Sequence, residues 1–179
     1  MKRTLTVGLV FLCLAVAHAD EIPGWKITSG KWSQEKDAIH TTGGTLLYEA
    51  RAKKGFTLKC RITIHEWLGT AGRANACILW AFKGTKPGQP EWANRHIFVV
   101  KPDLVYVSGP NGVGQKKQQV KVPLGKPLTV TIKSTPSKTE VLFGKLKLMT
   151  YNKYTDPNSI ALVVTDADVV FEKIKIKTK

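Results

Sequence analysis

Hydrophobic and polar residues alternate with a period of two along nearly every apolar segment of this 179-residue chain. In the longest example, Phe56 to Ile64, the apolar residues share one face and Thr, Lys and Arg occupy the other. Alternation of this kind is typical of strands that bury one face against a core. The pattern recurs at Leu128–Ile132 and Leu146–Leu148, and no segment has the spacing of an amphipathic helix. The sequence therefore predicts an all-β protein.

The C-terminal segment carries the same alternation with lysine as the polar residue. We expect Val170, Ile174 and Ile176 to face the core and Lys173, Lys175 and Lys177 to face solvent. Clusters of Gly, Pro and Asn separate the apolar segments, beginning with Gly43-Gly44, which we interpret as a turn. About a dozen short strands with such spacing predict a β-sandwich or barrel.

The N-terminal 19 residues have the organisation of a secretory signal peptide. Lys2 and Arg3 precede a short apolar stretch, and Ala17-His18-Ala19 provides small residues at the expected cleavage site. The stretch is shorter than the roughly 20 residues of a membrane-spanning helix. We therefore predict a signal peptide at 1–19, one domain at 20–179, a secreted or periplasmic protein, and no transmembrane anchor after processing.

The chain is strongly basic, with 28 Lys and Arg against 13 Asp and Glu and a formal charge of +15. Loss of Lys2 and Arg3 with the signal peptide lowers this charge to +13. Most basic residues alternate with apolar ones along predicted strands, which is typical of solvated faces and protected sheet edges. No nucleic-acid-binding motif is present, so we expect no nucleic-acid partner. An acidic polysaccharide suits both the charge and an exported location.

Cys60 and Cys77 are the cysteines that remain after processing. If residues 56–82 form a hairpin that turns near Leu68-Gly69, these two residues lie opposite each other. The distance between the Cβ atoms of opposed residues on neighbouring strands is close to the distance that a disulfide requires. Two small buried thiols are the alternative, since free cysteine is commonly found in protein cores.

Short motifs along the domain carry a family resemblance. They comprise Gly30-Lys31-Trp32, Asp37-Ala38-Ile39-His40, Gly43-Gly44-Thr45-Leu46-Leu47-Tyr48, Phe56-Thr57-Leu58, Leu128-Thr129-Val130-Thr131-Ile132 and Val169-Val170-Phe171-Glu172-Lys173-Ile174. This succession resembles the 3-keto-disaccharide hydrolase family. The resemblance implies a concanavalin-like jelly-roll β-sandwich of two antiparallel sheets, related in fold to laminarinase-type glucanases. Members carry an Asn-Ser-Gly-Ile-like stretch, which appears here as Asn75-Ala76-Cys77-Ile78.

The predicted glycan-binding residues come from the long hairpin and the two segments that follow it. In the resembled fold these segments line the concave sheet. Aromatic rings stack on sugars there, while Asn, His and Arg side chains supply hydrogen bonds. The candidates are Trp67, Arg73, Asn75, Trp80, Trp92, Arg95 and His96. For Trp80, which lies within an apolar run, packing in the core is the alternative.

Residues suited to catalysis are sparse. Glu66 follows His65 at a predicted strand end and is the best candidate for proton transfer, although a solvated strand end explains the pair as well. No nucleophile elbow or paired metal-ligand motif occurs, so we predict no metal and no cofactor.

The leading hypothesis is an exported glycan-binding domain. An active keto-glycoside hydrolase or lyase is one alternative, and an envelope scaffold whose lysines bind acidic polymers is another.

Overall fold

The computed structural model describes residues 22–48, 55–80, 95–110, 114–151 and 159–178. Within these ranges all regular structure is β-strand, and no helix occurs. The strands are β1 (Trp25–Glu35), β2 (Ala38–Tyr48), β3 (Phe56–Trp67), β4 (Asn75–Trp80), β5 (His96–Val100), β6 (Leu104–Ser108), β7 (Lys116–Gln119), β8 (Leu128–Ser134), β9 (Lys138–Phe143), β10 (Leu146–Tyr151), β11 (Ile160–Thr165) and β12 (Ala167–Thr178). The predicted all-β fold of about a dozen strands is confirmed.

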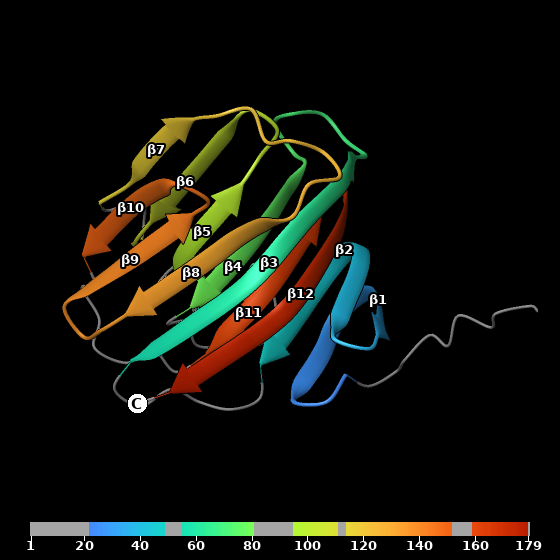
Figure 1. Ribbon diagram of the computed structural model, residues 1–179, viewed down its shortest axis with the longest axis horizontal. Helices are drawn as coiled ribbons and strands as arrows, with labels where there is room; N and C mark the ends of the chain where they lie inside the picture. The colour runs from blue at the N-terminus through green and yellow to red at the C-terminus, as the bar shows by residue number, and fades with distance from the viewer. Residues whose placement is uncertain (1–21, 49–54, 81–94, 111–113, 152–158, 179) are drawn as a thin grey trace, which may run out of the picture.

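The strands form two antiparallel layers packed face to face (Figure 1). Sheet one contains β10, β9, β8, β3, β12 and the first half of β2, in that order. Sheet two contains the second half of β2, then β11, β4, β5, β6 and β7. Strand β2 belongs to both sheets because its residues up to Thr41 pair with β12 and those from Gly44 pair with β11.

Two glycines allow β2 and its partner β1 to bend together where β2 passes between the sheets. Gly30 and Gly44 are paired in the register, and their φ angles are 78° and 141°. A Cβ atom on Gly44 would lie 2.3 Å from the backbone oxygen of Ser29, so no larger residue fits there. The turn predicted at Gly43-Gly44 is therefore wrong, since β2 continues through both residues and the glycine marks a bend.

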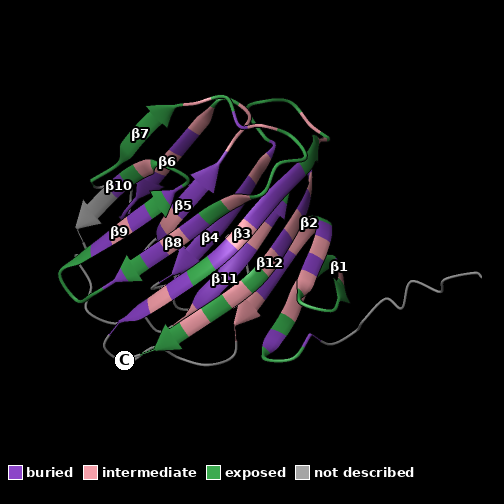
Figure 2. Ribbon diagram, in the orientation of Figure 1, coloured by how far each residue is buried: buried purple, intermediate pink, exposed green. Residues whose placement is uncertain are grey.

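The main core fills the space between the two sheets (Figure 2). Strand β3 shows the predicted alternation, since Phe56, Leu58, Cys60, Ile62 and Ile64 are all buried in this core. The inward residues of β8 and β10 follow the same rule. A second, smaller apolar cluster lies on the other face of sheet two and consists of Cys77, Leu79, Val99 and Ala161. Both faces of sheet two therefore carry buried side chains.

A β-bulge in β12 changes which of its residues face the core. The register with β3 shifts between Glu172 and Lys175, and Lys173 has a φ of 51°. One additional residue at the bulge reverses the alternation. Before the bulge the inward residue is Phe171, so the prediction that Val170 faces the core is wrong. After the bulge, Ile174 and Ile176 pack against the core as predicted.

The hairpin predicted over residues 56–82 does not form. Strand β3 pairs with β12 and β8 in sheet one, whereas β4 pairs with β11 and β5 in sheet two. The turn after Trp67 thus connects the two layers. Cys60 lies in the main core and Cys77 in the second cluster, and both are free thiols. The disulfide prediction is wrong, and the alternative of two buried thiols is confirmed.

Among the described residues, no helix is long and apolar enough to span a bilayer.

Candidate functional site

The alternation along β4 and β5 divides the predicted glycan-binding residues between two faces of sheet two. On β4, Asn75 and Cys77 point outward, while Ala76, Ile78 and Trp80 point into the main core. On β5, His96 pairs with Trp80 and therefore shares its inward direction. Arg95 precedes His96 directly, so it belongs to the outward face.

Trp80 and His96 are core residues and do not line an exposed face. Both have no solvent exposure, and their rings stack with centroids 5.7 Å apart. Phe56 contacts Trp80 edge-on from sheet one, at 6.4 Å. Burial lowers the pKa of His96 to about 4, so its ring is neutral at pH 7. For these two residues the expected sugar contact is incorrect, because each lies on the inward side of its strand.

The two other predicted tryptophans do not add to this face. Trp67 ends β3 in sheet one, where it pairs with Ala167 and packs, half-buried, against the main core. Trp92 lies outside the described residues.

Two of the remaining predicted residues, Asn75 and Arg95, lie with three others on the outward side of sheet two. We call this group the sheet-two patch, and it consists of Asn75, Cys77, Arg95, Lys101 and Tyr106. Cys77, Val99 and Tyr106 lie in one row across β4, β5 and β6. Lys101 continues β5 beside Asn75, and Lys101 and Leu104 are joined by a backbone hydrogen bond in the β5–β6 turn.

Hydrogen bonds hold the polar groups of the sheet-two patch in place. The Cys77 thiol donates to Oδ1 of Asn75 at 3.0 Å, and Nδ2 of Asn75 donates to the carbonyl oxygen of Arg73 at 2.6 Å. The amino group of Lys101 donates to the carbonyl oxygen of Gly72 at 2.7 Å. Arg73 is itself exposed and contributes its backbone to this arrangement. The turn before β4 thus positions both the amide and the ammonium group.

Burial keeps the thiol and phenol groups of the patch neutral. Burial raises the pKa of the Cys77 thiol to about 12, against the opposing effect of the nearby Arg95 and Lys101 charges. Burial also raises the pKa of Tyr106. The neighbouring Cys77 raises this pKa further, whereas the charge of Arg95 lowers it. At pH 7 the patch therefore presents two cations, an amide, and a phenol that can donate or accept a hydrogen bond.

Sequence reasoning did not identify Lys101 and Tyr106. Neither stands in a recognisable motif, and their place beside Asn75 and Cys77 depends on the register of three strands. The β5–β6 turn at Pro102-Asp103 was the available signal, because a short turn fixes which residues of the flanking strands face each other.

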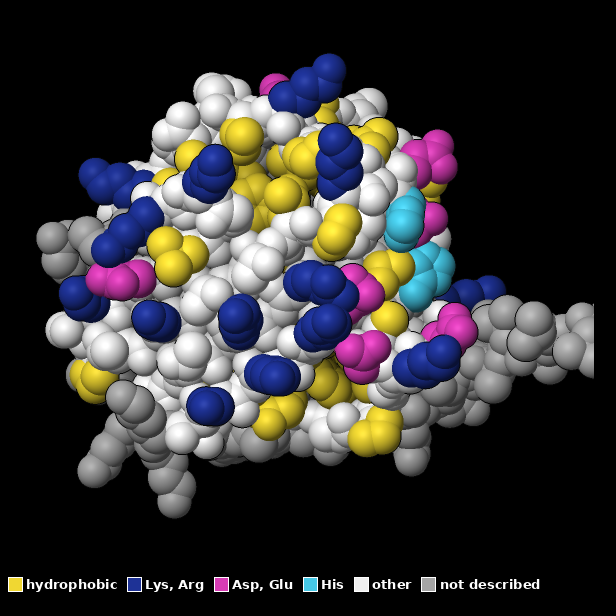
Figure 3. Space-filling model, viewed as in Figure 1, with side chains coloured by type: hydrophobic (Ala, Val, Ile, Leu, Met, Phe, Trp, Pro, Cys, Tyr) yellow, Lys and Arg dark blue, Asp and Glu magenta, His cyan; other side chains and the backbone are white. Residues whose placement is uncertain are grey.

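The predicted catalytic pair lies elsewhere, at one end of sheet one. The β3–β12 register shifts so that Glu66 pairs with Asp168 and Ile64 with Val169. This bulge leaves both His65 and Glu66 exposed at the sheet's outer face. His40 of β2 joins them, since its Nε2 lies 2.7 Å from Oδ1 of Asp168. Figure 3 shows the histidines beside acidic groups at the edge of this face.

This acid–histidine cluster combines groups that can exchange protons with a bound molecule. Glu66 and Asp168 are paired residues on adjacent strands, where Cβ atoms are about 4.5–5.5 Å apart. The sequence alone does not connect Asp168 with His40, because their contact depends on the pairing of β2 with β12. Within the described part of the chain, no group of three or more His, Cys, Asp or Glu side chains could hold a metal ion.

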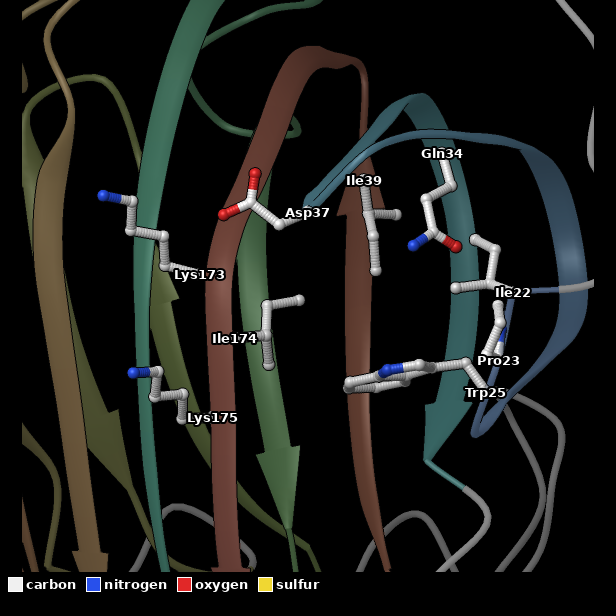
Figure 4. A pocket seen from close by; sticks show the side chains of 9 residues that line it. All are labelled: Ile22, Pro23, Trp25, Gln34, Asp37, Ile39, Lys173, Ile174 and Lys175. Atoms are coloured by element: carbon white, nitrogen blue, oxygen red, sulfur yellow. The ribbon is translucent and has the colours of Figure 1, made fainter.

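A pocket of about 530 Å³ opens at the edge of the sandwich beside β12. Its centre is apolar, with Trp25, Ile39 and Ile174 exposed to it (Figure 4). Lys173 and Lys175 form one rim, and their amino groups extend away from the indole. None of the predicted site residues lines this pocket.

Comparison with known proteins shows which solved structures have a similar fold. No protein-family model matches the chain, and no curated protein sequence matches it. Among solved structures, the carbohydrate-binding module CBM66 from Bacillus subtilis aligns with a TM-score of 0.61 at 16% identity, over 87% of this chain and 96% of the module. A candidate glycosyl hydrolase from Parabacteroides distasonis aligns with a TM-score of 0.65 at 14% identity, over 88% and 89%.

The lumenal domain of VIP36, solved with Ca²⁺ and Man3GlcNAc, aligns with a TM-score of 0.64 at 10% identity, over 86% of this chain and 83% of that domain. These identities are low, so the likeness concerns architecture. The protein is a jelly-roll β-sandwich of two antiparallel sheets.

Proposed function

We propose that the protein binds a glycan through the sheet-two patch. The observation that carries this proposal is the convergence of Asn75, Arg95, Lys101 and Tyr106 on one outward face. An amide and a phenol can hydrogen-bond sugar hydroxyls, and the phenol ring can stack on a sugar face. Solved proteins of similar architecture include a carbohydrate-binding module and carbohydrate-recognition domains, which supports this use of the fold.

The charges of the patch favour a glycan that carries a carboxylate or sulfate group. Arg95 and Lys101 place two cations on this face, and both kinds of side chain commonly bind carboxylate and sulfate groups. Because Lys101 already donates to Gly72 through one of its protons, two more remain for a ligand. We therefore expect an acidic sugar to bind more tightly than its neutral analogue.

Export belongs to the same proposal. Residues 1–19 serve as the signal peptide, and the domain at 20–179 meets its glycan outside the cytoplasm. The resemblance to 3-keto-disaccharide hydrolases supports a saccharide as the ligand class. Binding through hydrogen bonds, stacking and charge requires no cofactor or metal.

A glycan array with neutral, uronate-containing and sulfated saccharides tests this proposal. Wild-type protein should bind a defined subset, and Tyr106→Ala should weaken that binding at least tenfold. Lys101→Ala should lower the preference for acidic sugars, whereas Lys126→Ala, which removes the same charge from an exposed turn, should have little effect. An array without specific binding at low salt, or equal loss in both lysine variants, would contradict the proposal. Binding that ignores sugar identity and disappears in moderate salt would favour the scaffold hypothesis.

The acid–histidine cluster supports a second candidate, cleavage of a keto-glycoside by proton transfer at Glu66 and His65. The specific observation is that Glu66 pairs with Asp168, which in turn contacts His40. Two carboxylates at short separation are the arrangement used in glycoside hydrolysis. Turnover of 3-keto-glucosides that is lost in Glu66→Gln and retained in the exposed control Glu35→Gln would establish this activity. Absence of turnover in the wild type would exclude it for these substrates.

A further inference from the structure

The outer face of sheet one carries a regular array of lysines. We call it the lysine face, and it consists of the exposed side chains of Lys59, Lys133, Lys147, Lys175 and Lys177. The register places these residues in two rows across β12, β3, β8, β9 and β10. One row reads Lys177, Thr57, Lys133 and Glu140, and the next reads Lys175, Lys59, Thr131, Leu142 and Lys147. Figure 3 shows this basic surface directly.

The array brings like charges into direct opposition. Lys175 and Lys59 are paired residues on neighbouring strands, where side chains stand about 5 Å apart. Such a pair destabilises a sheet unless an anion lies between its members. Lys177 lies two residues further along β12, about 7 Å from Lys175. Positive charge is therefore concentrated where the C-terminal end of β12 lies beside the start of β3.

Three acidic residues of this face already contact basic groups. Glu172 contacts Arg61 at 3.4 Å, and Asp168 contacts His40 at 2.7 Å. Glu140 lies opposite Lys133 but is shared with Lys138 and Lys147, at 3.2 and 3.7 Å. Among the described residues, Lys59, Lys175 and Lys177 have no carboxylate within salt-bridge distance.

Two threonines lie between the lysines on β3 and β8, and Leu142 lies before Lys147 in the second row. Thr57 separates Lys177 from Lys133, and Thr131 follows Lys59 in the second row. The hydroxyls of these short side chains can hydrogen-bond a ligand that contacts the longer lysine side chains. The outward residues of β3, β8, β9 and β12 include no Phe, Tyr or Trp in the described structure. On these four strands the lysine face therefore lacks the stacking platforms of single-stranded nucleic-acid sites.

We propose that the lysine face binds a linear acidic polysaccharide. Its two rows of cations and its threonine hydroxyls fit an extended chain with repeated carboxylate or sulfate groups. This surface lies on sheet one, on the opposite side of the sandwich from the sheet-two patch. The proposal is independent of glycan binding at that patch, and together the two surfaces would let one molecule hold two saccharide chains.

Two triple variants of equal net charge test the proposal. Lys59→Gln, Lys175→Gln and Lys177→Gln together remove the centre of the lysine face. The matched control combines Lys26→Gln, Lys31→Gln and Lys126→Gln, which remove three exposed lysines from β1 and a turn. The probes are polygalacturonate, dextran sulfate and neutral dextran, measured by calorimetry or biolayer interferometry at several salt concentrations. Thermal melting of both variants verifies that each is folded.

The wild type should bind both anionic polymers and not neutral dextran. The lysine-face variant should bind polygalacturonate at least tenfold more weakly. The slope of its log Kd against log salt should fall by roughly two to three, since each of the three cations removed contributes about 0.7–0.9 to that slope. The control should change less than twofold, and Tyr106→Ala should leave polymer binding unchanged. Equal losses in both triple variants, equal binding of neutral dextran, or tighter binding of single-stranded DNA than of polygalacturonate would overturn the proposal.

Discussion

The burial of His96 in the core leads to a specific prediction about stability and pH. Its imidazole has no solvent exposure, and neither ring nitrogen has a hydrogen-bond partner among the described residues. Burial lowers the pKa of His96 from 6.5 to about 4. Between these two values the unfolded chain carries a proton on this residue and the folded chain does not. The free energy of unfolding should therefore fall as the pH drops from about 6.5 towards 4.

The size of this effect follows from the two pKa values. The complete difference between them corresponds to roughly 3 kcal/mol, of which about 2 kcal/mol should be lost between pH 7 and pH 5. Phenylalanine has a similar shape, does not titrate, and can keep the stack on Trp80. His96→Phe should thus remove this part of the pH dependence. It should also raise stability at pH 7 by about 1 kcal/mol, because two unpaired buried nitrogens disappear.

Urea unfolding followed by tryptophan fluorescence at pH 5, 6 and 7 measures both quantities. The control is His65→Gln, which replaces an exposed histidine and should keep the wild-type pH profile. If His96→Phe loses as much stability as the wild type between pH 7 and pH 5, His96 is not a buried neutral residue. The placement of its strand with that side chain inward would then be wrong.

Three more predictions concern the fold. Gly44→Ala should lower the free energy of unfolding by more than about 1 kcal/mol, because Gly44 has a positive φ and a close backbone neighbour. The control Gly72→Ala should be neutral in the same urea titration, since a Cβ atom there would meet nothing within 4 Å. The chain 20–179 should react with two equivalents of thiol reagent when unfolded without reductant, since Cys60 and Cys77 are free; a count of zero would indicate a disulfide. Trp80→Ala should cost about 3–5 kcal/mol of unfolding free energy, and a melting temperature close to the wild-type value would contradict its central place in the core.

The alternation of side chains was sufficient to predict the strands and most of the core. It failed in β12 because one additional residue at Lys173 shifts the pattern, and the sequence carries no glycine there to signal a bulge. It also could not tell which strands pair. The segment after Trp67 looks like a hairpin turn locally, but it connects two sheets, and this choice depends on contacts with β12 and β11 that are distant in sequence.

The candidate site could be predicted in part. Asn75 and Arg95 do lie on the outward face of sheet two, but Trp80 is an odd number of residues from Asn75 on the same strand. Two such residues point to opposite faces, as do the adjacent Arg95 and His96. The odd spacing between these residues is visible in the sequence. It is therefore sufficient to exclude Trp80 and His96 from the face that carries Asn75 and Arg95. The contribution of Lys101 required the register of β4 and β5.

The central claim is that a glycan occupies the outward face of sheet two. The most direct measurement is a ¹⁵N–¹H correlation NMR titration of the domain with the saccharide that binds best on the glycan array. The account predicts that the amide signals that move belong to β4, β5 and β6 around Asn75, Lys101 and Tyr106. Signals that move instead around His65 and Glu66 on sheet one, or beside Trp25 at the edge pocket, would contradict it.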